Sequence, residues 1–303
     1  MESSVANLPL YLQPWWWDAA TGAPDQWQAA EVRDHTGQLQ AYWPYYPQRR
    51  LGFIKLHSLP PLTMHSGPWL RSPLPEAKPA KVLSRNWKLI DALLQQLPKA
   101  HYQRAKAPYS FQNGMALQRA GWQQTVKYSY QLPTKQLATT EEIQMRFAPH
   151  VRQQLKKASS MVVLEPNPTI DIQLDLIHKA FKARGAKSSK FPDAAFNRLY
   201  QAAGERAAAV SWQAVDDKDR VHATLWMAYD EQTAYAILPA ADPELRTSGA
   251  MSLLLWQGIR WAQQESLVFD FEGSAIPGVE EFYRGFGPDP IPYYLFQKGL
   301  AWR

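Results

Sequence analysis

The sequence predicts a mixed α/β protein made of two domains with a similar order of elements. In the second half, from about residue 161 to residue 298, strand-like and helix-like periods follow one another as β-α-α-β-β-β-α-β-α-β. The first half shows part of that order, with three strands, a helix, a strand, a helix and a strand. Such an order is typical of mixed-sheet α/β folds. The repeat indicates an internal duplication with a boundary near Pro133–Thr140, and hence domains of residues 1–135 and 136–303.

Composition excludes several classes of chemistry. The chain of 303 residues has no cysteine, which rules out disulfides, thiolate metal sites and cysteine nucleophiles and suits a reducing compartment. Its net charge of +6 favours anionic ligands such as coenzyme A, tRNA or an anionic lipid surface. The N-terminal stretch lacks the pattern of a signal peptide, and no apolar run approaches the length of a membrane span. We therefore expect a soluble, cytoplasmic protein.

The elements of the first half follow from alternation, helical spacing and turn residues. They are a hairpin over residues 27–46, strands over 51–56, 101–107 and 122–132, and helices over 85–97 and 111–120. Ser84 is the expected cap of the longer helix. A long Pro-rich loop, 59–75, separates the third strand from this helix. We expect His57 and His65 to be loop residues, because two histidines without a nearby carboxylate are a weak metal motif.

The second half begins with a helix that carries acidic residues in its first turn and basic residues in its last, as the helix dipole prefers. The expected elements are helices over 141–157, 172–184, 192–203, 251–262 and 280–287, and strands over 161–165, 207–215, 221–229, 233–239, 267–274 and 292–298. No P-loop and no metal-binding motif occurs in the sequence, so neither a P-loop nucleotide site nor a metal is expected.

The turn before the long apolar helix is the first candidate site. Thr247 and Ser248 are favourable N-cap residues, and Gly249 allows close approach of the backbone to a ligand. Residues 251–262 are apolar on nearly every face, which predicts a buried helix. A helix that opens beside a glycine offers free amides and a partial positive charge to a phosphate or pyrophosphate. The alternative is an ordinary capped helix without a ligand.

Two motifs in this region resemble those of the GNAT acyltransferase superfamily, and within it the FemAB-like, two-domain branch. The first is the (Arg/Gln)-x-x-Gly-x-(Gly/Ala) turn that holds the pyrophosphate of coenzyme A, which Arg246, Gly249 and Ala250 fit and from which Met251 departs. The second is a C-terminal pattern matched by Asp270, Phe271, Gly273, Ser274, Phe282, Arg284, Phe286 and Gly287.

The resemblance implies two tandem GNAT-like domains, of which the first is degenerate and the second keeps the donor site. The donor would be acyl-CoA, with aminoacyl-tRNA as the other possibility, and no metal would be needed. The residues implied in donor binding are Arg246, Thr247, Ser248, Gly249, Ala250 and Met251. The acceptor would be an amine on a small molecule, peptide or cell-wall precursor, bound in a cleft between the domains.

The candidate catalytic residues are Tyr283, Glu272 and Asp270. The resemblance implies that Tyr283 protonates the departing thiolate; the alternative is that it only packs between helix and sheet. Alternation along a strand places Asp270 and Glu272 on the same face, where a carboxylate could take a proton from the amine. One of these carboxylates could instead form a structural ion pair with Arg284.

Further candidates concern the acceptor. The segment 179–190 contains five basic and no acidic residues, so it forms either a solvated face or a clamp for phosphates or an anionic acceptor. The candidate contacts to the acceptor are Arg184, Lys187, Lys190, Tyr235 and Arg284, of which Tyr235 could also belong to the core.

Two alternatives remain open from the sequence. No pair of long charged helices is inserted in the second half, which favours acyl-CoA over aminoacyl-tRNA. Met251 in the turn, and a Tyr at position 283 where the FemAB-like branch more often has Lys, are compatible with a binding module that has kept the fold and lost the chemistry.

Overall fold

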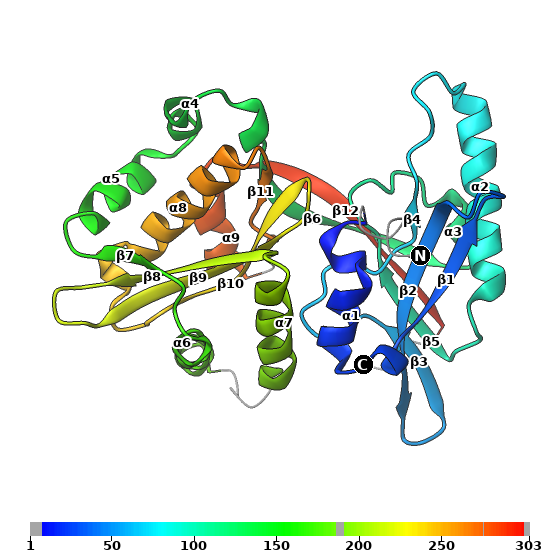
Figure 1. The fold of residues 1–303 in the computed structure, drawn as a ribbon, viewed down its shortest axis with the longest axis horizontal. Coiled ribbons are helices and arrows are strands. Elements are labelled where there is room, and N and C mark those ends of the chain that lie inside the picture. The colour runs from blue at the N-terminus through cyan, green and yellow to red at the C-terminus, as the bar shows by residue number, and fades with distance from the viewer. Residues whose placement is uncertain (1–7, 186–190, 275, 300–303) are drawn as a thin grey trace. The chain divides into compact units, whose positions relative to one another are not determined.

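The computed structural model describes residues 8–185, 191–274 and 276–299 (Figure 1). The chain divides into two compact units, one formed by residues up to 128 together with those from 292, the other by residues 129–291. The expected division after residue 135 assigned the C-terminal segment to the second domain. That segment instead lies in the first unit, because its strand pairs there.

The first unit contains a mixed sheet with the strand order β1-β2-β3-β5-β12. Neighbouring strands are antiparallel except for β3 and β5, which are parallel. A short strand, β4, pairs with β2 beside β1. The strands are β1 (Gln28–Arg33), β2 (Leu39–Arg50), β3 (Ile54–Ser58), β4 (Trp69–Leu70), β5 (Tyr102–Lys106) and β12 (Asp289–Gly299).

The helices of this unit are α1 (Pro14–Thr21), α2 (Pro79–Gln96) and α3 (Met115–Arg119), with short 3₁₀ turns η2 (Leu10–Leu12) and η3 (Pro24–Gln26). Helix α2 begins at Pro79, not after Ser84 as expected, because Pro is favourable in the first helical turn. The Ser84 hydroxyl donates to the carbonyl of Ala80 inside the helix. His57 lies on β3, so the expectation of a loop residue is wrong there. His65 is a loop residue as expected, and it is buried against Tyr109 and Tyr293.

In the second unit the sheet has the strand order β6-β11-β10-β9-β8-β7, with β6 belonging to this unit from Ser129 onward. Within this order only β10 and β11 are parallel. Helices α6 and α7 lie on one face of this sheet, and α5 and α8 on the other (Figure 1). The strands are β6 (Gln123–Leu132), β7 (Val163–Pro166), β8 (Ala209–Val215), β9 (Val221–Tyr229), β10 (Thr233–Ala241) and β11 (Val268–Asp270). From β7 to β12 the structure confirms the predicted order β-α-α-β-β-β-α-β-α-β and the mixed α/β class.

The helices of the second unit are α4 (Thr140–Met145), α5 (Pro149–Ala158), α6 (Ile170–Ala183), α7 (Asp193–Glu205), α8 (Ala250–Gln264) and α9 (Pro277–Arg284), with 3₁₀ turns η4 (Thr134–Gln136) and η6 (Arg246–Ser248). The single helix expected over 141–157 is two helices. Thr139 and Glu142 form a capping box at α4, and Pro149 in the first turn of α5 starts a new helix. Within the described ranges, no helix is long and apolar enough to span a membrane.

Helix α8 packs on the sheet with unusually little space. Its buried residues include Leu254, Leu255, Ile259 and Ala262, which confirms the expectation of a buried helix. Gly258 faces the strands. A Cβ at this position would lie 2.5 Å from Met227 Sδ and 3.0 Å from Leu225 Cδ2. The absence of a side chain at residue 258 therefore sets how closely α8 approaches β9.

We predict that Gly258→Ala destabilises the protein by about 1–3 kcal/mol, because the new methyl group overpacks the core. The matched control is Gly204→Ala at the exposed end of α7, where nothing lies within 4 Å of the added Cβ. The control should be neutral or more stable by about 0.5–1 kcal/mol, since Ala is the better helix former. Urea unfolding of both variants is the measurement. Equal effects at the two glycines would contradict this account of the α8 contact.

Candidate functional site

The site lies where β10 and β11 part. The two strands are parallel and pair only from Thr233–Val268 to Tyr235–Asp270. Beyond that pair β11 ends, whereas β10 continues to Ala241. The segments that leave the carboxyl ends of both strands therefore start from the same edge of the sheet. Such edges are where open α/β sheets bind ligands.

A β-bulge on β10 accompanies this opening. Ile237 pairs with Trp226 and Ala240 with Thr224, so β10 has one more residue than β9 between these pairs. Leu238 in the bulge has φ +52°, and its carbonyl accepts a hydrogen bond of 2.9 Å from the buried amide of Gln173 on α6. We did not predict the bulge from the sequence. Pro239 was the available signal, since Pro inside a strand is confined to edges and bulges.

The turn before α8 differs from the expected cap. Thr247 and Ser248 belong to η6, and Gly249 is the N-cap, with φ +76° and no capping side chain. The buried Ser248 hydroxyl donates to the carbonyl of Leu245 at 2.9 Å and accepts from the amide of Ala250 at 3.3 Å. One of the amides expected to be free is thus engaged by the protein itself.

Gly249 is required by a contact between helices. Besides its left-handed backbone, a Cβ at Gly249 would lie 3.0 Å from the carbonyl oxygen of Gln154 on α5. The side chain of Gln154 also accepts a hydrogen bond of 2.6 Å from Ser252 in the first turn of α8. Close approach of α5 is therefore a reason for this glycine that the sequence did not predict.

Part of the turn nevertheless remains available to an anion. The amide of Met251 donates no hydrogen bond to another described residue. Arg246 and Thr247 are exposed, and Lys157 of α5 donates to the carbonyl of Thr247 at 2.5 Å. The turn thus carries an exposed Arg246 and is contacted by Lys157 beside the positive end of α8, a set of groups that suits a phosphate. We did not predict Lys157, because its contact joins segments far apart in sequence.

Glu272 follows β11 in a strained conformation. The strand ends at Asp270, so the expected alternation does not reach Glu272, which has φ +60° and is followed by Gly273 at φ +66°. Although the residue is partly exposed, Oε1 is buried and has no hydrogen-bond partner in the described chain. Burial raises the pKa of Glu272 to about 8. A non-glycine residue in this region, with an unsatisfied carboxyl oxygen, is a feature typical of functional sites.

Asp270 has structural partners. Its side chain is fully buried and accepts hydrogen bonds from Ser129 Oγ at 2.6 Å, from Gln131 Nε2 at 2.8 Å and from the amide of Glu272 at 2.7 Å. In the described part of the chain, the ion pair of Arg284 is not the one considered with a carboxylate of this strand. Arg284 is exposed and pairs with Glu280 on its own helix, with Nε and Oε1 2.8 Å apart.

Tyr283 lies close to Glu272 and Arg184. Its ring is 6% exposed and packs on Phe271, with ring centroids 5.1 Å apart. Burial raises the pKa of Tyr283, the negative charge of Glu272 raises it further, and the positive charge of Arg184 at the end of α6 acts in the opposite direction. The structure thus brings Arg184 close to Glu272 and Tyr283, which follow it in the sequence by 88 and 99 residues.

The remaining candidates are placed differently. Tyr235 is buried, and its hydroxyl lies 3.4 Å from Asp230, so it is a core residue. Lys187 and Lys190 lie outside the described residues. Lys179, from the same basic segment, pairs with Asp175 and Asp242, which removes it from an open cationic clamp.

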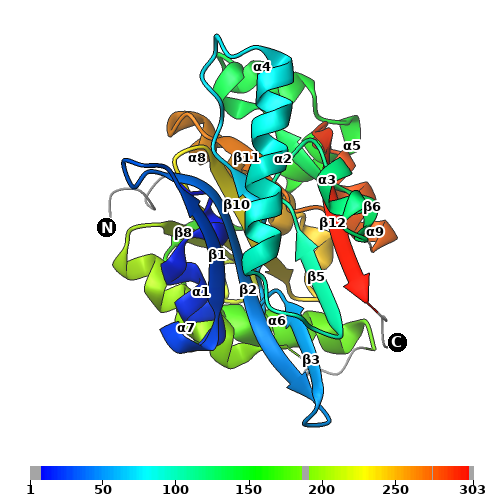
Figure 2. The same cartoon turned by 90° about the vertical axis from the view of Figure 1, so that its right-hand side faces the viewer.

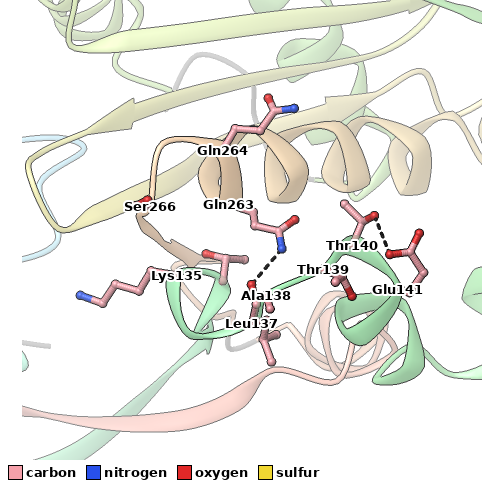
Figure 3. Close-up of a pocket in the computed structure, with 10 residues that line it drawn as sticks. Lys135, Leu137, Ala138, Thr139, Thr140, Glu141, Gln263, Gln264 and Ser266 are labelled. Carbon is pink, nitrogen blue, oxygen red and sulfur yellow. Dashed lines mark hydrogen bonds between the residues drawn. The ribbon is translucent and has the colours of Figure 1, made fainter.

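A surface pocket of about 500 Å³ lies away from these residues (Figure 3). Its lining comes from η4, the start of α4 and the C-terminal end of α8, where Gln263 donates to the carbonyl of Leu137 at 2.9 Å. Helix α8 has 15 residues, which separates its two ends by about 22 Å. The pocket is therefore distinct from the turn at Gly249. In the described ranges no group of three or more His, Cys, Asp or Glu side chains could hold a metal ion.

The comparison with known proteins agrees with this geometry. Residues 145–284 match the model of the acetyltransferase (GNAT) domain family. The crystal structure of FemX superimposes with a TM-score of 0.68 at 12% identity, over 96% of this chain and 93% of FemX. No curated protein matches the sequence.

Two further structures show the same fold. The C-terminal domain of a putative lysylphosphatidylglycerol synthetase from Agrobacterium fabrum has a TM-score of 0.56 at 12% identity, covering 98% of this chain and 90% of that domain. A tandem GNAT protein from the clavulanic acid biosynthesis pathway has a TM-score of 0.50 at 9% identity, covering 98% and 93%. Residues 145–284 thus match a GNAT acetyltransferase domain, and the chain as a whole shares its fold with FemX and with a tandem GNAT protein.

Proposed function

We propose that the protein is an N-acyltransferase that moves an acyl group from acyl-CoA to an amine acceptor, a small molecule or peptide, in the cytoplasm. The observation that carries the proposal is the Glu272 carboxyl near Tyr283, where β10 and β11 part. Its Oε1 is buried and has no hydrogen-bond partner among the described residues. The same proposal takes the first unit as a degenerate GNAT-like domain.

Glu272 would act as the base. A neutral amine must lose a proton as it attacks a thioester and becomes an amide, and a base works best when its pKa is near the working pH. Burial raises the pKa of Glu272 to about 8, which brings this carboxyl into that range. In the proposed step the amine nitrogen bonds to the thioester carbon, its proton passes to Glu272, and the carbon–sulfur bond then breaks to release the thiolate.

Tyr283 would act as a hydrogen-bond donor. Because burial raises its pKa, the hydroxyl stays protonated at neutral pH. A protonated phenol can stabilise the oxyanion of the tetrahedral intermediate or the departing thiolate. The positive charge of Arg184 acts on the same hydroxyl and favours negative charge that develops there. Asp270 would be a positioning residue, since it holds the amide of Glu272.

The donor would bind at the turn before α8. Its phosphates would be held by the region of Arg246, Thr247, Ser248, Gly249, Ala250 and Met251, with Lys157 added from α5. An aminoacyl-tRNA is the other donor class, and its polyanionic backbone would make binding strongly dependent on salt. A binding module without chemistry would have no use for an unpaired buried carboxyl, whose burial costs stability. This cost favours catalysis over binding alone.

The donor is tested by calorimetry with coenzyme A. We expect saturable binding to the wild-type protein and about tenfold weaker binding to Lys157→Ala or Arg246→Ala, since each loses one charge-assisted contact to phosphate. Lys156→Ala is the matched control, because Lys156 is the exposed neighbour of the residue that donates to Thr247, and this variant should bind like the wild type. No heat at millimolar coenzyme A would reject this donor. Binding of tRNA with an affinity that falls steeply as salt is raised would support aminoacyl-tRNA as the donor.

The base is tested by pH-dependent turnover of acetyl-CoA with a panel of primary amines. Thiol release can be followed with a thiol reagent, because the chain contributes no cysteine background. For the wild type we expect kcat/KM to rise with pH through about 8, the pKa of Glu272. Glu272→Gln should lower kcat by about 10²–10⁴-fold and lose this rise. If the wild type and Glu272→Gln bound coenzyme A equally well and neither turned over any amine, the result would support a binding module without catalysis.

The buried carboxyl also predicts a pH-dependent stability. Between pH 4.5 and about 8, the folded state keeps the Glu272 proton that the unfolded state has lost, so stability falls as pH rises across this window. Glu272→Gln removes this dependence. Urea unfolding should therefore show a stability difference, variant minus wild type, that grows from pH 5 to pH 8.5 and then levels off. A difference that does not change with pH would contradict the buried, unpaired carboxyl.

A further inference from the structure

The tip of the β2–β3 hairpin exposes two large apolar side chains. Arg50 pairs with Ile54, which leaves Leu51, Gly52 and Phe53 as the connecting loop. Leu51 is 74% exposed and Phe53 is 69% exposed. Figure 2 shows this hairpin extending past the ends of the other strands of its sheet. The two side chains therefore lie at a protruding point of the first unit.

Local backbone preference does not explain this tip. Leu51 has φ +52° and Gly52 has φ +76°, both in the left-handed region. Gly or Asn is usual in such turn positions, because a branched side chain is strained there and a polar one is solvated. Leu51 therefore disfavours the turn and exposes apolar surface at the same time. A second surface that receives the tip would account for both features.

Basic residues surround the apolar tip. Arg49, Arg50 and Lys55 flank the loop and are exposed. None of these three side chains forms an ion pair with a residue that the structure describes, and Arg49 contacts only the carbonyl of Gly52, at 3.4 Å. The sequence has no acidic residue between Asp34 and Glu76. The positive charge at the tip is thus not neutralised along this part of the chain.

We propose that the β2–β3 tip is a docking point for an anionic lipid bilayer. Leu51 and Phe53 would enter the boundary between headgroups and acyl chains, while Arg49, Arg50 and Lys55 lie against the lipid phosphates. Apolar burial and attraction to anionic headgroups together produce such peripheral binding. The surface of three loop residues is far below the roughly 800 Å² per partner of a stable protein interface. A bilayer requires no such area, and the tip therefore fits a lipid surface better than a second copy.

The first experiment is sedimentation of the full chain with vesicles. The probes are vesicles of phosphatidylcholine alone and of phosphatidylcholine with 30% phosphatidylglycerol. We expect binding to the anionic vesicles that weakens as salt is raised, because each basic residue interacts with the surface charge over a Debye length. Leu51→Asn with Phe53→Ser should lower the partition coefficient at least tenfold. Asn at position 51 suits the left-handed backbone, so this variant should fold as well as the wild type.

Matched controls distinguish binding by the tip from non-specific adsorption of exposed apolar side chains and from an effect of net charge. Met145→Ser removes an apolar side chain of the same 74% exposure from α4 and should not change binding. Arg49→Gln with Arg50→Gln should lower binding about tenfold or more. Lys81→Gln with Lys218→Gln removes the same net charge elsewhere and should have a much smaller effect.

A second experiment locates the contact. Because the chain has no cysteine, Phe53→Cys accepts a single environment-sensitive fluorophore, and Met145→Cys is the matched position. With anionic vesicles, the emission of the label at position 53 should shift to the blue, while the label at position 145 should not change. The proposal would be overturned if the emission shifted equally at both positions or if the wild-type protein did not bind vesicles. It would also be overturned if the protein self-associated and mutation of the tip abolished that self-association. None of these outcomes depends on acyltransferase activity.

Discussion

The hydrogen bonds of the Asp270 carboxylate are the interaction on which the candidate site depends. This side chain is completely buried, and it accepts hydrogen bonds from Ser129 and Gln131 on β6 and from the amide of Glu272. The first two tie β11 to its antiparallel neighbour, although only two residue pairs join these strands. The third ends the strand and turns the chain into the left-handed conformation of Glu272. A buried carboxylate with three donors is well stabilised, and it can offset the strain that follows it.

Two carboxyl groups only two residues apart therefore have opposite surroundings. Asp270 is surrounded by donors, whereas Glu272 Oε1 has none among the described residues. Burial without donors disfavours the charged form, which raises the pKa of Glu272 to about 8. Two neighbouring acids with such different environments commonly divide a structural and a chemical role between them. We assign the structural role to Asp270 and propose the chemical one for Glu272.

The turn at Arg246–Met251 fits the expected motif, but its glycine and its amides make contacts that the motif did not predict. The pattern at Arg246–Met251 led us to expect several open amides and a glycine that a ligand approaches. In the structure Gly249 instead accommodates the carbonyl of Gln154, and the buried Ser248 hydroxyl engages one amide. What remains for an anion is the amide of Met251 together with the cations Arg246 and Lys157. In the proposed phosphate site, basic side chains therefore contribute more, and backbone amides less, than the motif alone indicates.

The sequence by itself determined the order of elements in the second half, the burial of α8 and the mixed α/β class, because these follow from periodicity, turn residues and local propensity. It also pointed to Glu272, through alternation along a strand, and to Tyr283, through the resemblance to GNAT enzymes. Only the tertiary structure decided that β12 joins the first unit, that β10 carries a bulge, that Arg284 pairs with Glu280, and that Arg184 and Lys157 lie near the site. The physical reason is that pairing and electrostatic contacts depend on which distant segments meet, and local patterns carry no information about that.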